Sequence, residues 1–151
     1  MRVPEMSISA EARLRVRYAE TDQMAVVYYA NYLVWMEVGR VELCRACGFN
    51  YRDMEGDDGV LLAVAESNCR YRYPARYDDE VIVKTWIEKA DRRMVMFSYE
   101  MRLEKDGRVL ATGHTKHRFL GKDFRPTTLP EKYFSMFGIE PKPRIHTDQH
   151  G

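Results

Sequence analysis

The sequence lacks the features of membrane-spanning, secreted and nucleic-acid-binding proteins. It contains no run of 18 apolar residues, so no segment predicts a membrane span. Residues 1–6 lack the apolar centre of a signal peptide, and we therefore expect a cytoplasmic protein. The 24 basic residues nearly balance the 23 acidic ones, which gives no reason to expect nucleic acid or an anionic membrane as a partner.

Cysteine and histidine are too few and too scattered to suggest a metal centre. Cys44 and Cys47 have the spacing of a redox or zinc pair, but no second ligand pair follows. We therefore interpret both, together with Cys69, as structural thiols. His114 and His117 lie three residues apart on an expected strand and so point to opposite faces. The chain also lacks a nucleophile-elbow serine motif, a Walker loop and a Rossmann glycine pattern.

The most informative stretch is residues 14–47, which reads as a strand, a turn and a long helix. The strand is indicated by four residues that alternate onto one face: Ala12, Leu14, Val16 and Tyr18. A nearly continuous apolar run follows Ala30 and ends before Gly48, a typical C′ residue. We expect a helix that is apolar nearly all round and therefore buried. Glu37 inside it needs a partner, and Arg40 is expected to supply one.

The remaining chain predicts mainly strands. Alternating apolar residues indicate strands over residues 65–73, 81–88, 95–103 and 109–119, while residues 49–59 read as a polar surface connection. A short helix is expected after Leu129, beginning near Pro130. One long helix with five antiparallel strands predicts an α+β fold in a single domain over residues 1–151. Residues 1–11 and about 141–151, with His146 and His150, are expected to be a loose arm and a loose tail.

One acidic residue lies close to the expected start of the helix. The first N–H groups of a helix lack internal partners and favour negative charge, so they can hold a carbonyl oxygen that becomes an oxyanion. Asp22 lies seven residues before Tyr29, and its carboxylate can reach the same place. An acid beside such N–H groups suits general-base or nucleophilic attack on an acyl group. From spacing alone, a simple turn capped by Thr21 and Asp22 is the favoured interpretation.

Two segments resemble a known family. VRYAETDQMAVVYYANY at residues 16–32 resembles the signature of the hotdog-fold acyl-CoA thioesterases of the 4-hydroxybenzoyl-CoA thioesterase type. YRYPARYDDE at residues 71–80 resembles that family's strand end followed by a Pro-Ala turn. The similarity runs from about residue 13 to residue 137. It implies a curved five-stranded antiparallel sheet that wraps around one long central helix.

The resemblance also implies roles for individual residues. Asp22 matches the catalytic carboxylate, and Tyr29 matches the position whose backbone N–H polarises the thioester carbonyl. Arg92 and Arg93 match basic residues that bind coenzyme A phosphates, although without the family match a solvated turn is the simpler interpretation. Coenzyme A would be part of the substrate, and no other cofactor or metal is implied. The chain departs from the family at two positions. Many members have His where this chain has Tyr29, and members often have Gly where it has Ala25.

Several functions remain open on this fold. The main expectation is an enzyme that hydrolyses an acyl-CoA thioester, and the alternative is a non-catalytic module that binds acyl-CoA or acyl-carrier protein. A hotdog dehydratase is disfavoured because no histidine precedes Gly113. The acyl group, and the choice between coenzyme A and a carrier protein, are open. The family implies a homodimer or homotetramer, and exposed apolar residues are expected at Tyr71, Tyr73, Trp86, Met94 and Met96.

Overall fold

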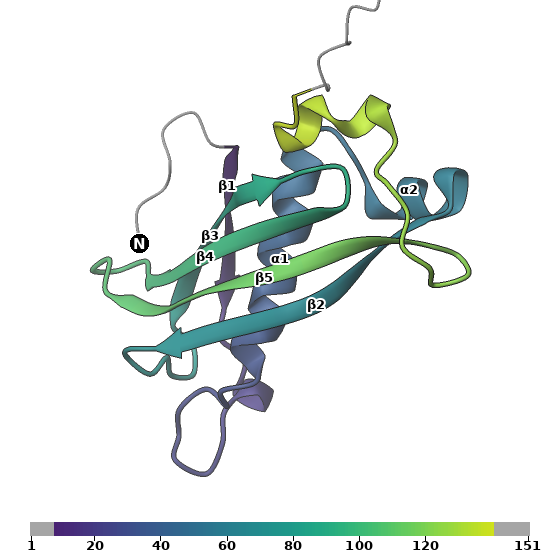
Figure 1. Cartoon of the computed structure of the whole chain (residues 1–151). Coiled ribbons are helices and arrows are strands. Elements are labelled where there is room, and N and C mark those ends of the chain that lie inside the picture. The colour runs from purple at the N-terminus through teal and green to yellow at the C-terminus, as the bar shows by residue number, and fades with distance from the viewer. Residues whose placement is uncertain (1–7, 141–151) are drawn as a thin grey trace, which may run out of the picture.

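A computed structural model describes residues 8–140 as one antiparallel sheet packed against one long helix (Figure 1). The sheet has the spatial order β1-β3-β4-β5-β2, and every neighbouring pair is antiparallel. The five strands are β1 (Ser9–Arg15), β2 (Val60–Tyr71), β3 (Glu80–Ala90), β4 (Met94–Leu103) and β5 (Val109–Gly121). The predicted α+β class and the number of strands are confirmed.

The long helix α1 (Asn31–Ala46) ends as predicted, with Gly48 at a φ of +87° two residues after its last turn. Its buried residues recur every three or four positions and face the sheet: Tyr32, Trp35, Met36, Gly39, Leu43 and Cys44. Gly39 allows a close approach to β3, because a Cβ atom there would lie 2.2 Å from Thr85 Oγ1. The sequence of α1 thus contains both the apolar stripe and the small residue that its packing requires.

The prediction that α1 is buried all round is wrong. Leu33, Val34 and Val38 are 39%, 50% and 41% exposed, because a single sheet covers only one side of the helix that packs on it. Glu37 also lies on the exposed side of the helix. Contrary to the prediction, Arg40 does not pair with Glu37 but donates a hydrogen bond of 3.1 Å to the Tyr99 hydroxyl. Apolar residues on the outer side of α1 are therefore available for a contact with another molecule.

Residues 49–59 are not simply a surface connection, since they include a second helix, α2 (Tyr51–Asp58). The Asn50 side chain caps it by accepting a hydrogen bond from the Arg52 N–H at 2.7 Å. Met54 is fully buried beneath the helix, and Gly59 ends it with a φ of +66°. The sequence contains the cap, the buried Met54 and the terminal glycine of this helix. The many acidic residues nevertheless led to the interpretation of the segment as a surface connection.

Both ends of the described chain differ from what the sequence predicted. Residues 9–11, assigned to a loose arm, form the start of β1 and pair with β3. β1 ends at Arg15, and Tyr18, expected on the strand, lies in a 3₁₀ turn (Tyr18–Glu20). After Leu129, two 3₁₀ turns replace the expected short helix, and the buried Phe134 and Phe137 anchor them. The expectations for residues 1–7 and for 141–151, including His146 and His150, lie outside the described residues.

The expected exposed aromatic surface is only partly present. Tyr71 and Tyr73 are exposed, and Met94 and Met96 are half-buried. Trp86 is only 1% exposed, so the prediction that it contributes to an exposed surface is wrong. It lies opposite two small residues of the neighbouring strands, Ser9 and Ser98, which leave room for the indole ring. Within residues 8–140, no helix is long and apolar enough to cross a membrane.

Candidate active site

Asp22 is held in a narrow loop between β1 and α1. Thr21 and Val27 form an isolated antiparallel bridge, and the Asp22 N–H donates to the Val26 carbonyl at 2.9 Å. One carboxylate oxygen of Asp22 accepts a hydrogen bond from the Met24 N–H at 2.8 Å. The other oxygen has no hydrogen-bond partner within the described part of the chain. The loop therefore orients the carboxylate and leaves one oxygen available for chemistry.

Ala25 shows why its position favours glycine. Its φ is +63°, in the left-handed region that is costly for residues with a Cβ atom. The Ala25 N–H donates to the Asp22 carbonyl at 2.9 Å and closes the turn. The departure from the family's glycine therefore leaves the turn in place, with local strain at a residue three positions from the carboxylate.

The chain enters α1 through a turn that leaves amide groups unused. The N–H groups of Asn31, Tyr32 and Leu33 donate to the carbonyl oxygens three residues earlier, at 2.9, 3.2 and 3.1 Å. Within residues 8–140, the N–H groups of Tyr29 and Ala30 have no hydrogen-bond acceptor. Tyr29 lies two residues before the helix, slightly earlier than predicted. Its amide is nevertheless a free donor beside a helix N-terminus.

Asp22 and Tyr29 line the same pocket, which has a volume of about 280 Å³. The other lining residues are mostly apolar or aromatic: Met24, Val26, Val27, Tyr32, Tyr71, Arg72, Tyr73 and Pro74. The Tyr71 hydroxyl donates to the Tyr29 carbonyl at 3.1 Å. Burial, followed by contact with the Cys69 thiol, raises the pKa of Tyr71 to about 12, so this hydroxyl remains protonated near neutral pH. The pocket is thus lined by an acid, by a residue whose amide has no acceptor within residues 8–140, and by apolar and aromatic residues.

Sequence reasoning missed Glu20, a residue that forms hydrogen bonds to several segments around this pocket. Its buried carboxylate accepts hydrogen bonds from the Arg17 N–H at 2.8 Å and the Trp35 indole at 3.0 Å. Its backbone carbonyl accepts from the Tyr28 N–H at 2.8 Å and the Asn31 side chain at 2.9 Å. Glu20 therefore connects the turn before Asp22, the segment around the free amides and the body of α1.

The charge on Glu20 is maintained despite its burial. Burial raises the pKa of the carboxyl group, but the Arg17 N–H, the Trp35 indole and the Arg17 guanidinium at 3.6 Å outweigh this effect. The net result is a pKa below its ordinary value. No periodic pattern predicts a buried glutamate, because charged residues are usually exposed.

Arg92 and Arg93 are not brought to this pocket within one chain. They lie on the β3–β4 turn, at the opposite end of the sheet from the Asp22 loop (Figure 1), and line a separate pocket with Ile139 and Glu140. The backbone of the turn is fixed, since Asp91 accepts from the Arg93 N–H at 2.7 Å. Within one chain, these arginines and Asp22 therefore belong to separate pockets.

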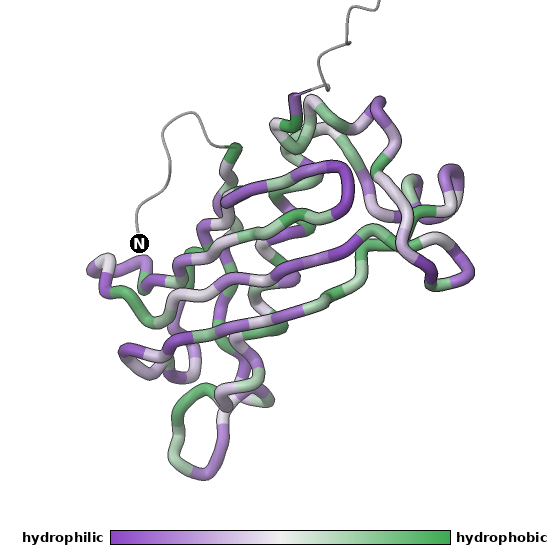
Figure 2. The backbone as a smooth tube through the Cα atoms, viewed as in Figure 1, coloured by the Kyte–Doolittle hydropathy of each residue, from purple (hydrophilic) through white to green (hydrophobic). Residues whose placement is uncertain are grey.

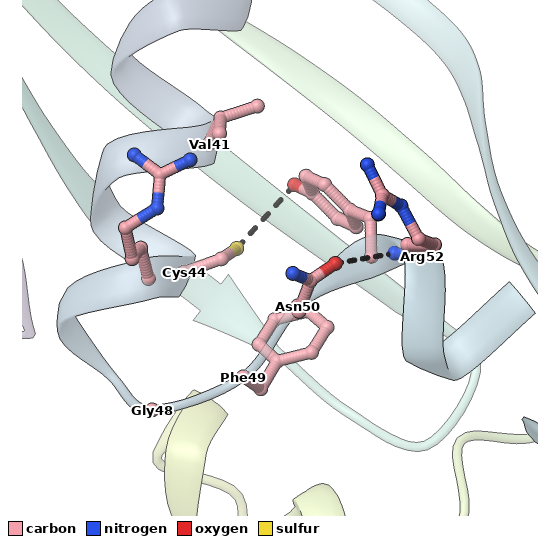
Figure 3. A pocket seen from close by; sticks show the side chains of 8 residues that line it. Val41, Cys44, Gly48, Phe49, Asn50 and Arg52 are labelled. Carbon is pink, nitrogen blue, oxygen red and sulfur yellow. Dashed lines mark hydrogen bonds between the residues drawn. The ribbon is translucent and has the colours of Figure 1, made fainter.

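A larger hollow, of about 520 Å³, lies at the other end of α1 (Figure 3). The Cys44 thiol points across it toward Tyr51 and donates a hydrogen bond of 3.4 Å to the tyrosine hydroxyl. None of the eight residues that line it is a carboxylate or a histidine. Because α1 is about 24 Å long, this hollow is separate from the Asp22 pocket and lacks its acid.

His114, His117 and the three cysteines occupy structural positions. His117 is buried and hydrogen-bonds to Thr115 at 2.8 Å, whereas His114 lies on the opposite face near Glu66, as the strand pattern predicted. Cys44, Cys47 and Cys69 are free thiols. Within residues 8–140, no group of three or more histidine, cysteine, aspartate or glutamate residues could hold a metal ion.

The fold and the pocket first define a class, the hotdog-fold proteins. A crystal structure of a DHNA-CoA thioesterase from Staphylococcus aureus superposes with a TM-score of 0.79 at 37% identity, covering 86% of each chain. A complex of a 4-hydroxybenzoyl-CoA thioesterase mutant with 4-hydroxybenzoyl-CoA gives the same TM-score over 85% of this chain and 98% of that one. At 18% identity, the second likeness supports the fold alone.

The sequence comparisons then give the family. The model of the thioesterase superfamily matches residues 24–110. YneP of Bacillus subtilis, assigned as an acyl-CoA thioesterase, is 47% identical over 92 residues, which are 61% of this chain and 66% of that protein. The chain therefore belongs to the thioesterase superfamily. It is a thioester hydrolase, as the resemblance in the sequence implied.

Proposed function

We propose that the protein hydrolyses an acyl-CoA thioester to a carboxylic acid and coenzyme A, with Asp22 and the Tyr29 amide as its catalytic groups. One observation carries the proposal: Asp22, which has one carboxylate oxygen without a hydrogen-bond partner, and Tyr29, whose N–H has no acceptor within residues 8–140, line the same pocket. The family membership and the named relatives support the substrate class. The apolar and aromatic lining of the pocket suits an acyl group.

The Tyr29 N–H would donate a hydrogen bond to the thioester carbonyl oxygen and stabilise the negative charge that develops there. The free oxygen of Asp22 would then act by one of two routes. It removes a proton from a water that attacks the carbonyl carbon, or it attacks that carbon itself and forms an anhydride that water hydrolyses. In both routes the carbon–sulfur bond breaks, and the sulfur leaves as the thiolate of coenzyme A and takes up a proton. These two groups supply the base and the oxyanion donor, so the scheme needs no separate cofactor or metal.

The exposed apolar surface supports a homodimer. β2 is at the edge of the sheet and carries the exposed Val64, and its last residue, Tyr71, lines the pocket. Edge-to-edge pairing of two β2 strands would satisfy this edge and place a partner beside the pocket. In that assembly Arg92 and Arg93 of the partner subunit would bind phosphates of the ligand. The exposed side of α1, with Leu33 and Val34, would join two such dimers into a tetramer.

One side of the loop between β1 and α1 is coloured hydrophobic, whereas the other side is hydrophilic, and the hydrophobic side agrees with a subunit contact (Figure 2). Met24 in this loop is 75% exposed, although it is next to the pocket. Light scattering coupled to size exclusion tests the assembly, and Val64→Lys should shift it toward monomers, because an edge lysine opposes strand pairing. A monomeric wild-type protein would contradict this part of the proposal. Three free cysteines agree with a reducing compartment, and we place the enzyme in the cytoplasm.

The activity itself is tested by following thiol release from acetyl-, octanoyl-, palmitoyl- and benzoyl-CoA with a thiol-reactive dye. Turnover of at least one thioester, well above the rate without enzyme, is the expected result. Binding of these thioesters without turnover would instead support a non-catalytic acyl-CoA or carrier-protein module. The same assay with an acylated carrier protein decides which thiol carrier the enzyme prefers.

A further inference from the structure

We propose that Arg72 and Arg108 bind the phosphate group joined to the pantetheine arm of the ligand, at the end of a row of tyrosines that leads away from Asp22. This phosphate is common to coenzyme A and to the prosthetic group of acyl-carrier proteins. The inference rests on the proposed function for its choice of ligand. It differs from the expected role of Arg92 and Arg93, which lie at the other end of the sheet.

The tyrosines Tyr29, Tyr71 and Tyr73 line the pocket. The rings of Tyr29 and Tyr71 meet edge to face with their centroids 6.3 Å apart. Tyr73 follows two residues later and also lines the pocket. The Arg108 guanidinium lies over the Tyr73 ring, with its Cζ 4.3 Å from the centroid. The row extends over roughly 15 Å if an extended chain is assumed between the last two tyrosines, a length comparable to a pantetheine arm.

The two arginines come from neighbouring strands that are fixed to each other. Arg72 follows the end of β2, and Arg108 precedes the start of β5. The Leu110 carbonyl of β5 accepts hydrogen bonds from the N–H groups of both Arg72 and Tyr73, at 2.8 and 3.1 Å. Sheet pairing therefore places residues 72 and 108 on adjacent strand ends beside the pocket, which Arg72 lines directly and Arg108 approaches through the Tyr73 ring.

The charge on both arginines is available to a ligand. Within residues 8–140, neither guanidinium forms an ion pair, in contrast to Arg13 and Arg15 of β1, which pair with Glu104 and Asp78. Asp106 lies near Arg108, but its carboxylate accepts from the backbone N–H at 3.0 Å and so caps the turn. Asp22 is the only acid among the residues that line the pocket.

Arginine is suited to this task because its planar guanidinium can donate two parallel hydrogen bonds to phosphate oxygens. The stacking of Arg108 on Tyr73 restricts its side chain before the ligand binds, which lowers the entropy lost on binding. The aromatic path would guide the uncharged arm, and the arginines would hold its charged end. The thioester would then lie at the opposite end of the path, between Asp22 and the Tyr29 amide.

Calorimetric binding of four acyl-free ligands tests this inference without depending on catalysis. The ligands are coenzyme A, dephospho-coenzyme A, 4′-phosphopantetheine and pantetheine, of which only pantetheine lacks the phosphate in question. In Arg72→Ala/Arg108→Ala, the Kd of the first three should rise by at least about tenfold, which corresponds to about 1.4 kcal/mol. The Kd of pantetheine should change by less than about twofold. Arg125→Ala, at another exposed arginine, is the matched control and should bind all four ligands as the wild type does.

Each other outcome overturns the inference. An unchanged Kd for dephospho-coenzyme A and 4′-phosphopantetheine would show that these arginines do not bind that phosphate. An equal loss of affinity for pantetheine would show that they act on the arm or on the fold. These results are separable from failure of the proposed function, which is an absence of thioester hydrolysis by the wild-type enzyme. Relative turnover of acyl-CoA and acyl-carrier protein then identifies the source of the phosphate.

Discussion

Substitution of Glu20 tests how strongly one buried carboxylate organises the loop that carries Asp22. Glu20 is 7% exposed and accepts two hydrogen bonds, from the Arg17 N–H and the Trp35 indole. Glu20→Gln preserves the volume but replaces one carboxylate oxygen with an NH₂ group, so one donor must face another donor. Hydrogen bonds to charged groups contribute about 1.5–3 kcal/mol each. We expect a loss of about 2 kcal/mol in the free energy of unfolding, which lowers Tm by about 4–8 °C.

The same substitution should affect catalysis and pH dependence. Because the Glu20 backbone holds Tyr28 and Asn31, a looser loop misplaces the Tyr29 amide, and we expect kcat to fall by at least about tenfold. The pKa of Glu20 is lowered in the folded state, so its contribution to stability is present above pH 4.5 and is lost as the pH falls through the lowered value. The difference in Tm between wild type and Glu20→Gln should therefore shrink below pH 4.5.

Scanning calorimetry and steady-state kinetics measure these effects. Glu42→Gln is the matched control, since Glu42 forms an exposed ion pair with Arg45 at 3.0 Å, and both of these residues lie on α1. Such a pair contributes less than about 1 kcal/mol, so the control should retain both its stability and its activity. A Glu20→Gln enzyme with the Tm and kcat of the control would refute the idea that Glu20 organises the loop.

Two further predictions concern the packing beneath α1. Gly39→Ala places a Cβ atom 2.2 Å from Thr85 Oγ1 and should lower the free energy of unfolding by about 1–3 kcal/mol in denaturant titrations, whereas Gly56→Ala, with no atom within 4 Å, should be neutral or stabilising. Equal effects of the two substitutions would contradict the close approach of α1 to β3. Burial, followed by the nearby Arg40 charge, lowers the pKa of His117 to about 3, so wild-type stability should decline between pH 6.5 and pH 3 as the unfolded state takes up a proton. His117→Gln should lessen this decline in Tm, and an unchanged pH profile would show that His117 does not cause it.

Periodic patterns predicted the framework of the fold. The alternation on β3, β4 and β5 gave the strands and their buried faces, and the apolar run ending before Gly48 gave α1. These features depend on local sequence, since each residue's face follows from its position in a strand or helix. The periodicity of a sequence does not show which other part of the molecule packs on a given face of a strand or helix. The sequence therefore could not show that one side of α1 is exposed or that Trp86 is buried.

The site was predicted only in part, and for a comparable reason. The spacing between Asp22 and Tyr29 suggested that a loop acid approaches the start of a helix, and both residues line one pocket. Glu20 was missed because its partners, Arg17 and Trp35, are 3 and 15 residues away and form no recognisable motif. Arg72 and Arg108 become neighbours of the pocket only through the pairing of β2 with β5. Contacts of this kind require the tertiary structure.

The most direct test of the account is kcat for Asp22→Asn. The asparagine keeps an oxygen that can accept the Met24 N–H, so the loop and Tm should be preserved, but it is neither a base nor an effective nucleophile. Asp123→Asn, in a turn with the same type of hydrogen bond, controls for the substitution itself. We predict that Asp22→Asn lowers kcat at least a hundredfold and that the control retains wild-type activity. A folded Asp22→Asn enzyme with full activity would contradict the assignment of Asp22 as the catalytic carboxylate.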